Sequence, residues 1–391
     1  MSHLVVSRCS KITLTPPALR SVVHSVYALT LLLSLFLIAT VLWDAFETVV
    51  LPRTVSRRWR LTRLYFGVTW RHWSGAAARF RSDRRRERFL AIFGPLSLIG
   101  LAGVWASGLL IGFAGLQWSN GSHLRPFSAS GRFIDDLYLS GTTLFTLGLG
   151  DVQPVGHIAR LITVVEAGTG FAFLAIVIAY FPVLYQSFSR REARLTLLDA
   201  WAGSPPAAVE VLKRLAARRE LDALPSFLKD WEYWCSELLE SHISYPAVAF
   251  FRSQHQRQSW VSALTTILDL SALVEVGIEG VPGWQAHVTF AMARHAAVDL
   301  TQVLHAVPDP AADRLPDGDL EELRRQIELV GLRLERSPEA DRRLRDLRRS
   351  YEPFVNGLAR TLLMPTPPWW HRAPVRDNWQ VSPKGIAEAH L

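Results

Sequence analysis

Three long apolar runs constrain the fold of this chain more than any other feature: Val26–Trp43, residues 89–116, and a run from Ile158 to just before Arg190. The first holds 18 uncharged residues, and a helix of that length nearly spans a hydrocarbon core of about 30 Å. The second is uncharged throughout, and the third carries a single acid, Glu166. We therefore predict an integral membrane protein.

The first run has two interpretations, a cleaved signal peptide and a retained transmembrane helix. It is longer than a signal-peptide core of about 7–15 residues. Asp44 and Phe46 follow it, where a cleavage site needs small residues. Both observations favour a retained helix, so residues 1–52 are interpreted as an N-terminal segment and a first transmembrane helix.

Arginine dominates residues 53–88, which join the first two runs. The segment holds twelve arginines and two acids, interleaved with aromatic residues. This mixture is typical of a basic segment at a membrane interface, and the positive-inside rule places it in the cytoplasm. A pI near 9.9 also suits nucleic-acid binding, but here the basic excess lies beside apolar runs, so no nucleic acid is expected. We expect anionic lipids as partners, bound through Arg57, Arg58, Arg60, Arg84, Arg85 and Arg86.

The basic flanks predict a topology. Because arginines also follow the third run, the second run is expected to lead outward and the third to return. Residues 133–157 must then leave from and return to the outer side of the membrane. If the first run crosses the membrane and ends at the cytoplasmic basic segment, the N-terminus lies outside. Arg8, Lys11 and Arg20 favour the inside, so the side of the N-terminus stays open.

The segment "FIDDLYLSGTTLF", residues 133–145, is too short to cross a membrane as a helix and too apolar for an ordinary surface loop. A half-length helix at membrane depth is tolerated where it is buried in protein or lines a water-filled path. Asp135 and Asp136 at its start suit the positive end of the helix dipole. Its C-terminal end then favours a cation in the space beneath.

The stretch "TLGLGD", Thr146–Asp151, follows directly. Gly148 and Gly150 adopt left-handed backbone angles at low cost, and alternating left- and right-handed residues turn successive carbonyls to one side. Four such segments around an axis form rings of oxygens that replace the hydration shell of a cation. Thr146 adds a hydroxyl at the inner end, and Asp151 at the outer mouth raises the local concentration of cations.

This arrangement resembles the two-transmembrane pore module of the potassium-channel superfamily. The resemblance covers residues 89–189, with an outer helix at 89–116, a pore helix and filter at 133–151, and an inner helix at 158–189. It implies an all-α membrane protein that assembles as a homotetramer and conducts cations, most strongly K⁺. It implies no cofactor beyond K⁺ ions held at filter carbonyls. The implied filter positions are Thr146, Leu147, Gly148, Leu149 and Gly150, with Asp151 at the outer mouth.

Leu149 departs from the family, which usually has tyrosine or phenylalanine between the two glycines. Leucine packs against its surroundings but donates no hydrogen bond, so the width of the carbonyl rings is less firmly held. Three functions remain open on this ground. They are a potassium channel, a nonselective cation channel, and a membrane-anchored sensor or scaffold with a degenerate pore.

Further residues are expected to support or gate the filter. Glu166 is interpreted as bracing the filter from behind, with direct ion contact and an exposed interfacial carboxylate as alternatives. Tyr138 supplies packing in a pore helix that lacks tryptophan. Gly168 and Gly170 serve as a gating hinge or as close packing positions, and Pro182 is expected to kink the inner helix.

Residues 190–365 are predicted to form an all-helical cytoplasmic domain, and residues 366–391 a Pro-rich tail. No segment beyond residue 190 is expected to span the membrane. Ser204, followed by Pro205, and Ser337 are the predicted N-caps of two helices.

The C-terminal half carries no dinucleotide fingerprint, P-loop or EF-hand, and no recognisable nucleophile–base pair, so we expect no enzyme. Cys9 and Cys235 are too far apart to suggest a disulfide framework. The stretch that contains Arg252 and Arg257 is interpreted either as an anionic-ligand pocket or as a polar helix surface, and any cytoplasmic ligand is unknown. The composition fits a bacterial inner membrane.

Overall fold

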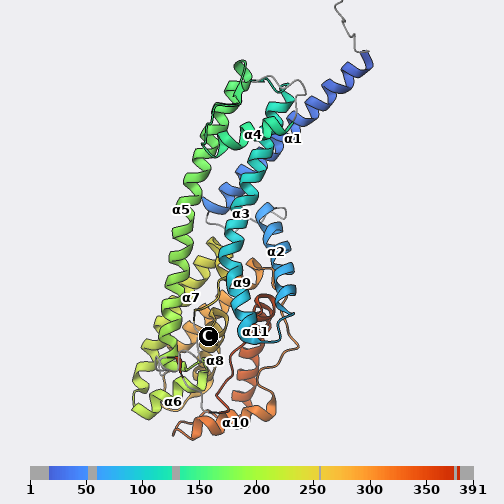
Figure 1. Cartoon of the computed structure of the whole chain (residues 1–391). Coiled ribbons are helices and arrows are strands. Elements are labelled where there is room, and N and C mark those ends of the chain that lie inside the picture. Colours follow the sequence, from blue (N-terminus) through green and yellow to red (C-terminus); the bar gives the residue numbers. More distant parts are fainter. Residues whose placement is uncertain (1–16, 52–59, 126–132, 255–256, 374–376, 379–391) are drawn as a thin grey trace, which may run out of the picture. The chain divides into compact units, whose positions relative to one another are not determined.

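A computed structural model describes most of the chain, and the described part is almost entirely helical (Figure 1). The model divides the chain into two compact units: a first unit of residues 1–46 and 101–179, and a second of residues 47–100 and 180–391. The described residues are 17–51, 60–125, 133–254, 257–373 and 377–378.

Three helices contain the three apolar runs: α1 (Pro17–Val49), α3 (Asp83–Ser119) and α5 (His157–Ala202). Each is long and apolar enough to cross a membrane. The outer and inner helices are therefore longer than the runs that predicted them. The unit boundary falls within α3, after Gly100, and within α5, after Ala179.

Helix α8 (Trp260–Gly277) is a fourth element of membrane-spanning length and composition, which the sequence analysis did not expect. Its apolar window is 89% buried within the protein. A helix that is apolar on all sides suits the centre of a helical core as well as a bilayer. Burial inside the second unit therefore accounts for the composition of α8.

In the first unit α1 packs closely on α3 through glycines. A Cβ atom added at Gly108 would lie 2.7 Å from Cγ2 of Val41, and one at Gly112 would lie 2.5 Å from Cγ1 of Ile38. Small residues at such positions let two helix backbones approach. Gly108 and Gly112 therefore serve as close-packing positions between the two helices.

A short hairpin-like pairing brackets α4 (Phe133–Leu144) and the stretch after it. Strand β1 (Leu124–Arg125) follows α3, strand β2 (Gln153–Pro154) precedes α5, and the two pair antiparallel. The pairing ties the two ends of the connection together, so that α4 and the residues after it form a closed loop between the long helices.

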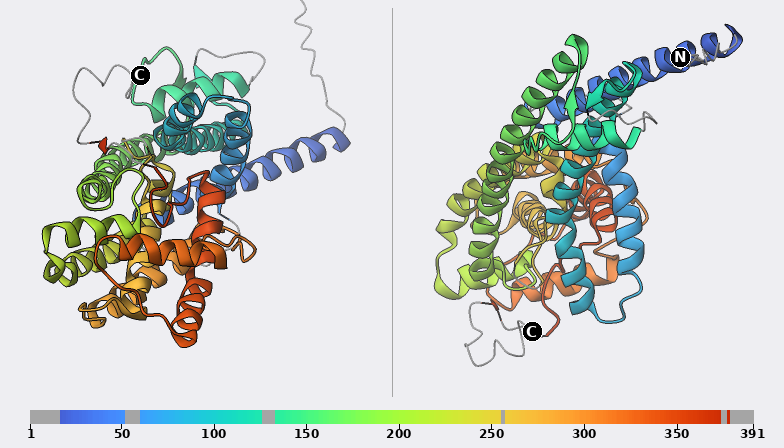
Figure 2. Two further views of the ribbon diagram at one scale, coloured as in Figure 1. Left: turned by 90° about the horizontal axis from the view of Figure 1, so that it is seen from below. Right: turned by 45° about the horizontal axis from the view of Figure 1, so that its top comes forward.

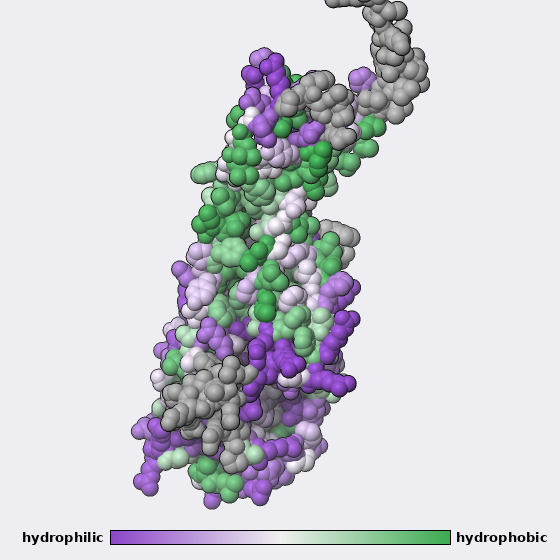
Figure 3. Space-filling model, in the orientation of Figure 1, coloured by the Kyte–Doolittle hydropathy of each residue, from purple (hydrophilic) through white to green (hydrophobic). Residues whose placement is uncertain are grey.

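Apolar side chains cover much of the surface of the first unit. On the face shown in Figure 3, green hydrophobic residues spread over α1 and α5 in this unit. Such a surface is unfavourable in water but suits a hydrocarbon environment. The most exposed of these side chains include those of Leu32, Phe36, Leu161, Val164, Phe171 and Ile178.

The second unit is a bundle in which α8 lies among its neighbours (Figure 2). Helices α7, α9 and α11 contact α8 directly, and α6 also packs against it. The other elements of this unit are α2 (Leu61–Ala77), α6 (Ala208–Arg218), η1 (Leu221–Ala223), α7 (Leu224–Ser244), η2 (Pro246–Phe250), α9 (Trp284–Val303), α10 (Asp317–Glu328) and α11 (Pro338–Leu362).

A buried charge network fixes the centre of this bundle. The carboxylate of Asp269 on α8 is fully buried and accepts hydrogen bonds from Nη1 and Nη2 of Arg314 at 2.8 and 2.6 Å. It also accepts one from the hydroxyl of Tyr351 on α11 at 2.5 Å. The guanidinium lies over the ring of Trp369. A buried charge is tolerated when it is paired and hydrogen-bonded in this way.

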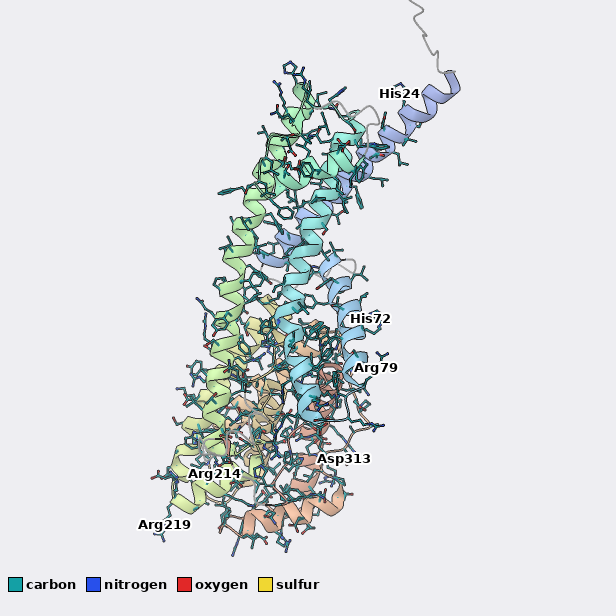
Figure 4. All side chains as sticks on the ribbon, in the orientation of Figure 1. His24, His72, Arg79, Arg214, Arg219 and Asp313 are labelled. Carbon is teal, nitrogen blue, oxygen red and sulfur yellow. The ribbon has the colours of Figure 1, made fainter. Side chains whose placement is uncertain are left out.

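The aromatic residues of α2 pack against protein. The rings of Trp73 and Phe89 stack with centroids 4.3 Å apart, and the indole of Trp70 donates to the carbonyl of Thr361 at 2.9 Å. These two rings therefore pack within the second unit, and lipid binding by the basic segment stays a prediction. The side chain of His72 extends from the other side of the helix (Figure 4). The exposed residues of α2 include Leu64, Val68, Arg71 and His72.

One of the two predicted N-caps is wrong. Helix α6 begins at Ala208, and Ala207 occupies its N-cap position without a side-chain cap. Helix α5 extends to Ala202, so the turn that follows it leaves Ser204 buried before the helix starts. The serine–proline pair belongs to this tight connection, which local sequence alone does not distinguish from a helix start.

The other predicted N-cap is confirmed. The hydroxyl of Ser337 accepts a hydrogen bond from the backbone N–H of Ala340 at 3.0 Å, and Pro338 is the first residue of α11. Replacing Ser337 by alanine is expected to lower the unfolding free energy by about 1 kcal/mol, because one N–H at the helix start loses its partner. Thermal unfolding of the purified chain measures the loss. Threonine at this position retains the hydroxyl and serves as the control, and equal stability of the two variants would contradict the assignment.

Candidate functional site

The backbone after α4 alternates in handedness. Thr146, Gly148 and Gly150 have φ values of +59°, +56° and +76°, whereas the intervening Leu147 and Leu149 are not in this region. The two glycines thus have the left-handed conformation that the sequence predicts. Thr146 adopts it despite its branched side chain, at a conformational cost that a glycine does not incur.

The C-terminal end of α4 holds the start of this stretch. The N–H groups of Leu147 and Gly148 both donate to the carbonyl of Thr142, at 2.8 and 3.1 Å, and the N–H of Thr146 donates to Thr143 at 3.0 Å. The short helix therefore satisfies the N–H donors at the start of the stretch, and the carbonyl oxygen of Gly150 at its end accepts from the side-chain amide of Gln153 at 3.0 Å.

The apolar side chains of the stretch are exposed when a single chain is considered. The side chains of Leu147 and Leu149 are 62% and 63% exposed, and Phe145 is also exposed. Large apolar groups side by side in this state mark a surface that contacts lipid or another protein chain.

Asp151 forms a side-chain link with α4. The hydroxyl of Tyr138 donates to Oδ2 of Asp151 at 2.7 Å, and Oδ1 accepts from the N–H of Val152 at 3.0 Å. The hydrogen bond from Tyr138 lowers the pKa of the Asp151 carboxyl below its usual value, so this group is ionised at neutral pH. The structure thus brings together Tyr138 and Asp151, which the sequence analysis treated separately.

Glu166 is fully buried on α5 and faces α4. Its Oε1 contacts the hydroxyl of Ser140, and the same hydroxyl lies 2.9 Å from the carbonyl oxygen of Leu110 on α3. This placement disagrees with an exposed interfacial carboxylate and agrees with a position behind the stretch. Sequence reasoning missed Ser140, because nothing in the local pattern separates it from the other small residues of α4.

Alanine in place of Glu166 is expected to lower the unfolding free energy by about 1–3 kcal/mol, since it removes one of the two hydrogen-bond partners of the buried hydroxyl of Ser140. The hydroxyl of Ser140 has one proton, which it donates either to the carbonyl of Leu110 or to Glu166. When it donates to Leu110, a donor at position 166 supplies the second hydrogen bond. Glutamine offers an N–H donor of similar shape, and Glu166→Gln is expected to lose less. Thermal unfolding in detergent compares the two variants. A larger loss for glutamine than for alanine would exclude this hydrogen-bond role.

The two glycines of the inner helix differ in their surroundings. A Cβ atom at Gly170 would meet the backbone carbonyl of Leu144, the last residue of α4, whereas Gly168 has no neighbour within 4 Å. Close packing therefore accounts for Gly170, and the hinge role remains a prediction for Gly168. Pro182 lies inside α5, which continues through it as one helix.

The predicted lipid-binding arginines have different surroundings in the second unit. Arg60 pairs with Glu47 at 3.6 Å and donates to the hydroxyl of Thr48 at 3.1 Å. Arg84 and Arg85 are exposed at the start of α3, and Arg86 is half-buried. The other two predicted positions, Arg57 and Arg58, lie outside the described residues.

Among the described residues, no three His, Cys, Asp or Glu side chains form a group able to hold a metal ion. Cys235 is buried with a free thiol, and Cys9 lies outside the described residues.

The loop between two long apolar helices, with its alternating backbone, matches a known family. Residues 103–186, which run from α3 through α4 into α5, match the family described as "Ion channel". This segment is therefore similar to an ion-channel pore module. The match contains all the predicted filter positions, and it supports an ion channel rather than an enzyme.

Relatives of this chain include one membrane protein and two proteins named LctB. It is 24% identical over 253 residues to the uncharacterized membrane protein YdjJ of Bacillus subtilis (strain 168), a match that covers 60% of this chain and 69% of that protein. It is 40% identical over 84 residues to protein LctB of Geobacillus stearothermophilus, covering 19% of this chain and 62% of the relative. A 44-residue match to protein LctB of Bacillus caldotenax is 46% identical and covers 11% of this chain and 32% of the relative.

The chain therefore spans less than two thirds of either LctB protein. No solved structure matches it. The family match and the apolar helices together identify a membrane protein.

Proposed function

We propose that this protein is a passive cation channel, selective for K⁺, which four copies of the chain assemble. The observation that carries the proposal is the alternating backbone from Thr146 to Gly150. Alternation directs successive carbonyls to one side, where oxygens replace the water around a dehydrated cation. One chain supplies a single oxygen at each level, so a complete ring needs several chains around an axis.

Two further observations support assembly around the stretch. The exposed Leu147 and Leu149 gain cover when neighbouring chains surround the filter. Asp151, ionised beside Tyr138, adds one negative charge per chain at the mouth and attracts cations. In this proposal Glu166 braces α4 from behind, and K⁺ is the cargo rather than a resident cofactor.

The proposed location is the inner membrane of a bacterial cell, with the second unit in the cytoplasm. The arginines at the start of α3 and after residue 189 support this orientation through the positive-inside rule. The second unit is proposed to act on the pore through α5, whose residues from Tyr180 onward belong to it.

A nonselective cation channel is the second candidate, and Leu149 is the residue that favours it. Replacing Leu149 by tyrosine is expected to raise the ratio of K⁺ to Na⁺ permeability, because the phenol adds a hydrogen bond that holds the width of the carbonyl rings. The reversal potential of the purified protein in planar bilayers, with K⁺ on one side and Na⁺ on the other, measures this ratio. Leu149→Phe, which adds a ring without a donor, separates packing from hydrogen bonding.

Stoichiometry and selectivity test the proposal together. A complex with the mass of four chains, and a reversal potential near that of K⁺ for the wild-type protein, are the expected results. A reversal potential near zero would favour a nonselective cation channel over a potassium channel. A stable monomer or dimer would contradict the proposed filter.

A further inference from the structure

An arginine-lined cavity of about 1120 Å³ lies wholly within the second unit. Its walls come from the start of α3, the loop after η2, and the C-terminal end of α11 with the residues that follow. Three acids, Asp83, Glu87 and Asp309, also line it, so its wall carries an excess of three positive charges. The arginines are Arg84, Arg86, Arg88, Arg252, Arg257 and Arg360.

Protein groups hold part of this basic wall in place. The guanidinium of Arg252 donates to the carbonyls of Leu362 and Leu363 at 2.6 and 3.1 Å, and it lies 3.5 Å from the carboxylate of Glu87. Arg360 pairs with Asp309 at 2.9 Å. These contacts fix two arginines of the wall and use two of its three acids.

One donor atom of the wall, on Arg86, has no protein acceptor. The Nε atom of Arg86 is shielded from solvent and has no hydrogen-bond partner. A shielded polar atom of this kind is unfavourable until an acceptor reaches it. Planar guanidinium groups match the oxygens of phosphate with paired, charge-assisted hydrogen bonds, so a phosphate-bearing anion is the ligand chemistry that this wall fits.

We propose that this cavity binds a phosphate-bearing anion and that its occupancy acts on α5. Two sources supply such a group, a phospholipid headgroup and a soluble phosphate compound. Arg84 and Arg88 lie on one face of α3, and the same face continues about one, two and three turns later with the exposed side chains of Ile92, Leu96 and Ile99. A phospholipid whose phosphate lies in the cavity meets this apolar stripe with its acyl chains.

The loop after η2 connects the cavity to the inner helix. Ser253 lines the cavity, and its hydroxyl donates to Oε1 of Glu192 on α5 at 3.2 Å. Arg191, almost fully buried, donates from Nη1 to the carbonyl of Val248 at 3.0 Å and from Nη2 to that of Phe251 at 2.8 Å. One short loop therefore contacts both the cavity and α5. The effect on conduction rests on the proposed channel function, whereas the binding site does not.

Binding to the full-length protein in nanodiscs tests the site. Inorganic pyrophosphate with phosphatidylcholine discs is the soluble probe, and retention of phosphatidylglycerol from mixed discs, measured by mass spectrometry, is the lipid probe. At least one probe is expected to bind, and Arg86→Gln with Arg257→Gln is expected to weaken that binding about tenfold, by loss of charge-assisted hydrogen bonds.

The matched control removes two charges elsewhere. Arg79 and Arg219 extend from the turn after α2 and from the end of α6 (Figure 4), and neither lines the cavity. Arg79→Gln with Arg219→Gln is expected to leave binding unchanged. Pyrophosphate binding alone identifies a soluble ligand, and phosphatidylglycerol binding alone identifies a lipid. Failure of both probes, or equal loss in both double variants, overturns the site.

Measurements of Rb⁺ flux test the channel function separately from the binding site. Addition of the probe that binds is expected to change Rb⁺ flux at least about twofold in the wild-type protein. Glu192→Ala removes the acceptor of Ser253 on α5 and does not change the cavity wall, so it is expected to reduce this response while binding persists. Unchanged flux on binding overturns the action on α5. Absence of flux under every condition contradicts the channel proposal, while the binding result still decides the site.

Discussion

Alanine in place of Gly148 is expected to abolish cation flux while the protein still folds. The residue has a φ of +56°, and a Cβ atom there meets nothing within 4 Å, so the substitution acts through backbone conformation alone. An L-residue in the left-handed region costs about 1–2 kcal/mol, and four subunits incur this cost at the same level of the proposed filter. The backbone then relaxes to negative φ, which turns a ring of carbonyls away from the axis.

Gly67 provides the matched control. It lies in α2, has ordinary helical angles, and also has open space around the added Cβ. Flux of Rb⁺ into liposomes is expected to be unchanged in Gly67→Ala and lost in Gly148→Ala, with equal amounts of assembled protein in both. Full flux in Gly148→Ala would show that the backbone conformation at this glycine does not matter for conduction.

Alanine in place of Gly170 is expected to reduce flux more than about tenfold. Its Cβ meets the backbone carbonyl of Leu144, which cannot rotate away as a side chain does. Forcing a methyl group into such a contact typically costs about 1–3 kcal/mol, and it displaces the end of α4 that holds the N–H groups of Leu147 and Gly148. Flux and thermal stability are measured on the same preparation, and both are expected to fall.

Gly168 is the control on the same helix. It is two residues away and has open space around an added Cβ, so Gly168→Ala is expected to keep its stability. If this variant retains stability but loses flux, the hinge prediction for Gly168 gains support. Equal stability and equal flux in Gly170→Ala and the wild-type protein would contradict the packing account.

The membrane helices and the filter stretch were predictable because their signals are local. An uncharged run of membrane length, a half-length apolar segment and paired glycines each depend on neighbours in sequence. Helix ends were less predictable: Ser337 caps α11, but Ser204 caps nothing, because its surroundings come from the turn after α5. Composition alone also does not distinguish α8 from a membrane helix, because its apolar residues on all sides are buried in a protein core.

The contacts around the candidate site depend on groups that are distant in sequence. The position of Glu166 inside α5 indicated a functional group, but its partner Ser140 is 26 residues away and has no distinguishing pattern. The cavity is a stronger case. Arg252 and Arg257 suggested a polar helix surface or a ligand pocket, and only folding brings them to Arg86 at the start of α3. Rules based on the spacing of residues in the sequence therefore do not predict this cavity wall.

Uptake of Rb⁺ by liposomes that contain the purified wild-type protein tests the central claim most directly. With a K⁺ gradient across the membrane and no added energy source, the account predicts Rb⁺ accumulation well above that of protein-free liposomes. This accumulation is expected to collapse when the K⁺ gradient is removed, by adding valinomycin with equal K⁺ concentrations on both sides. Uptake no greater than in protein-free liposomes, from a preparation in which the four-chain complex is intact, would contradict a cation-conducting pore.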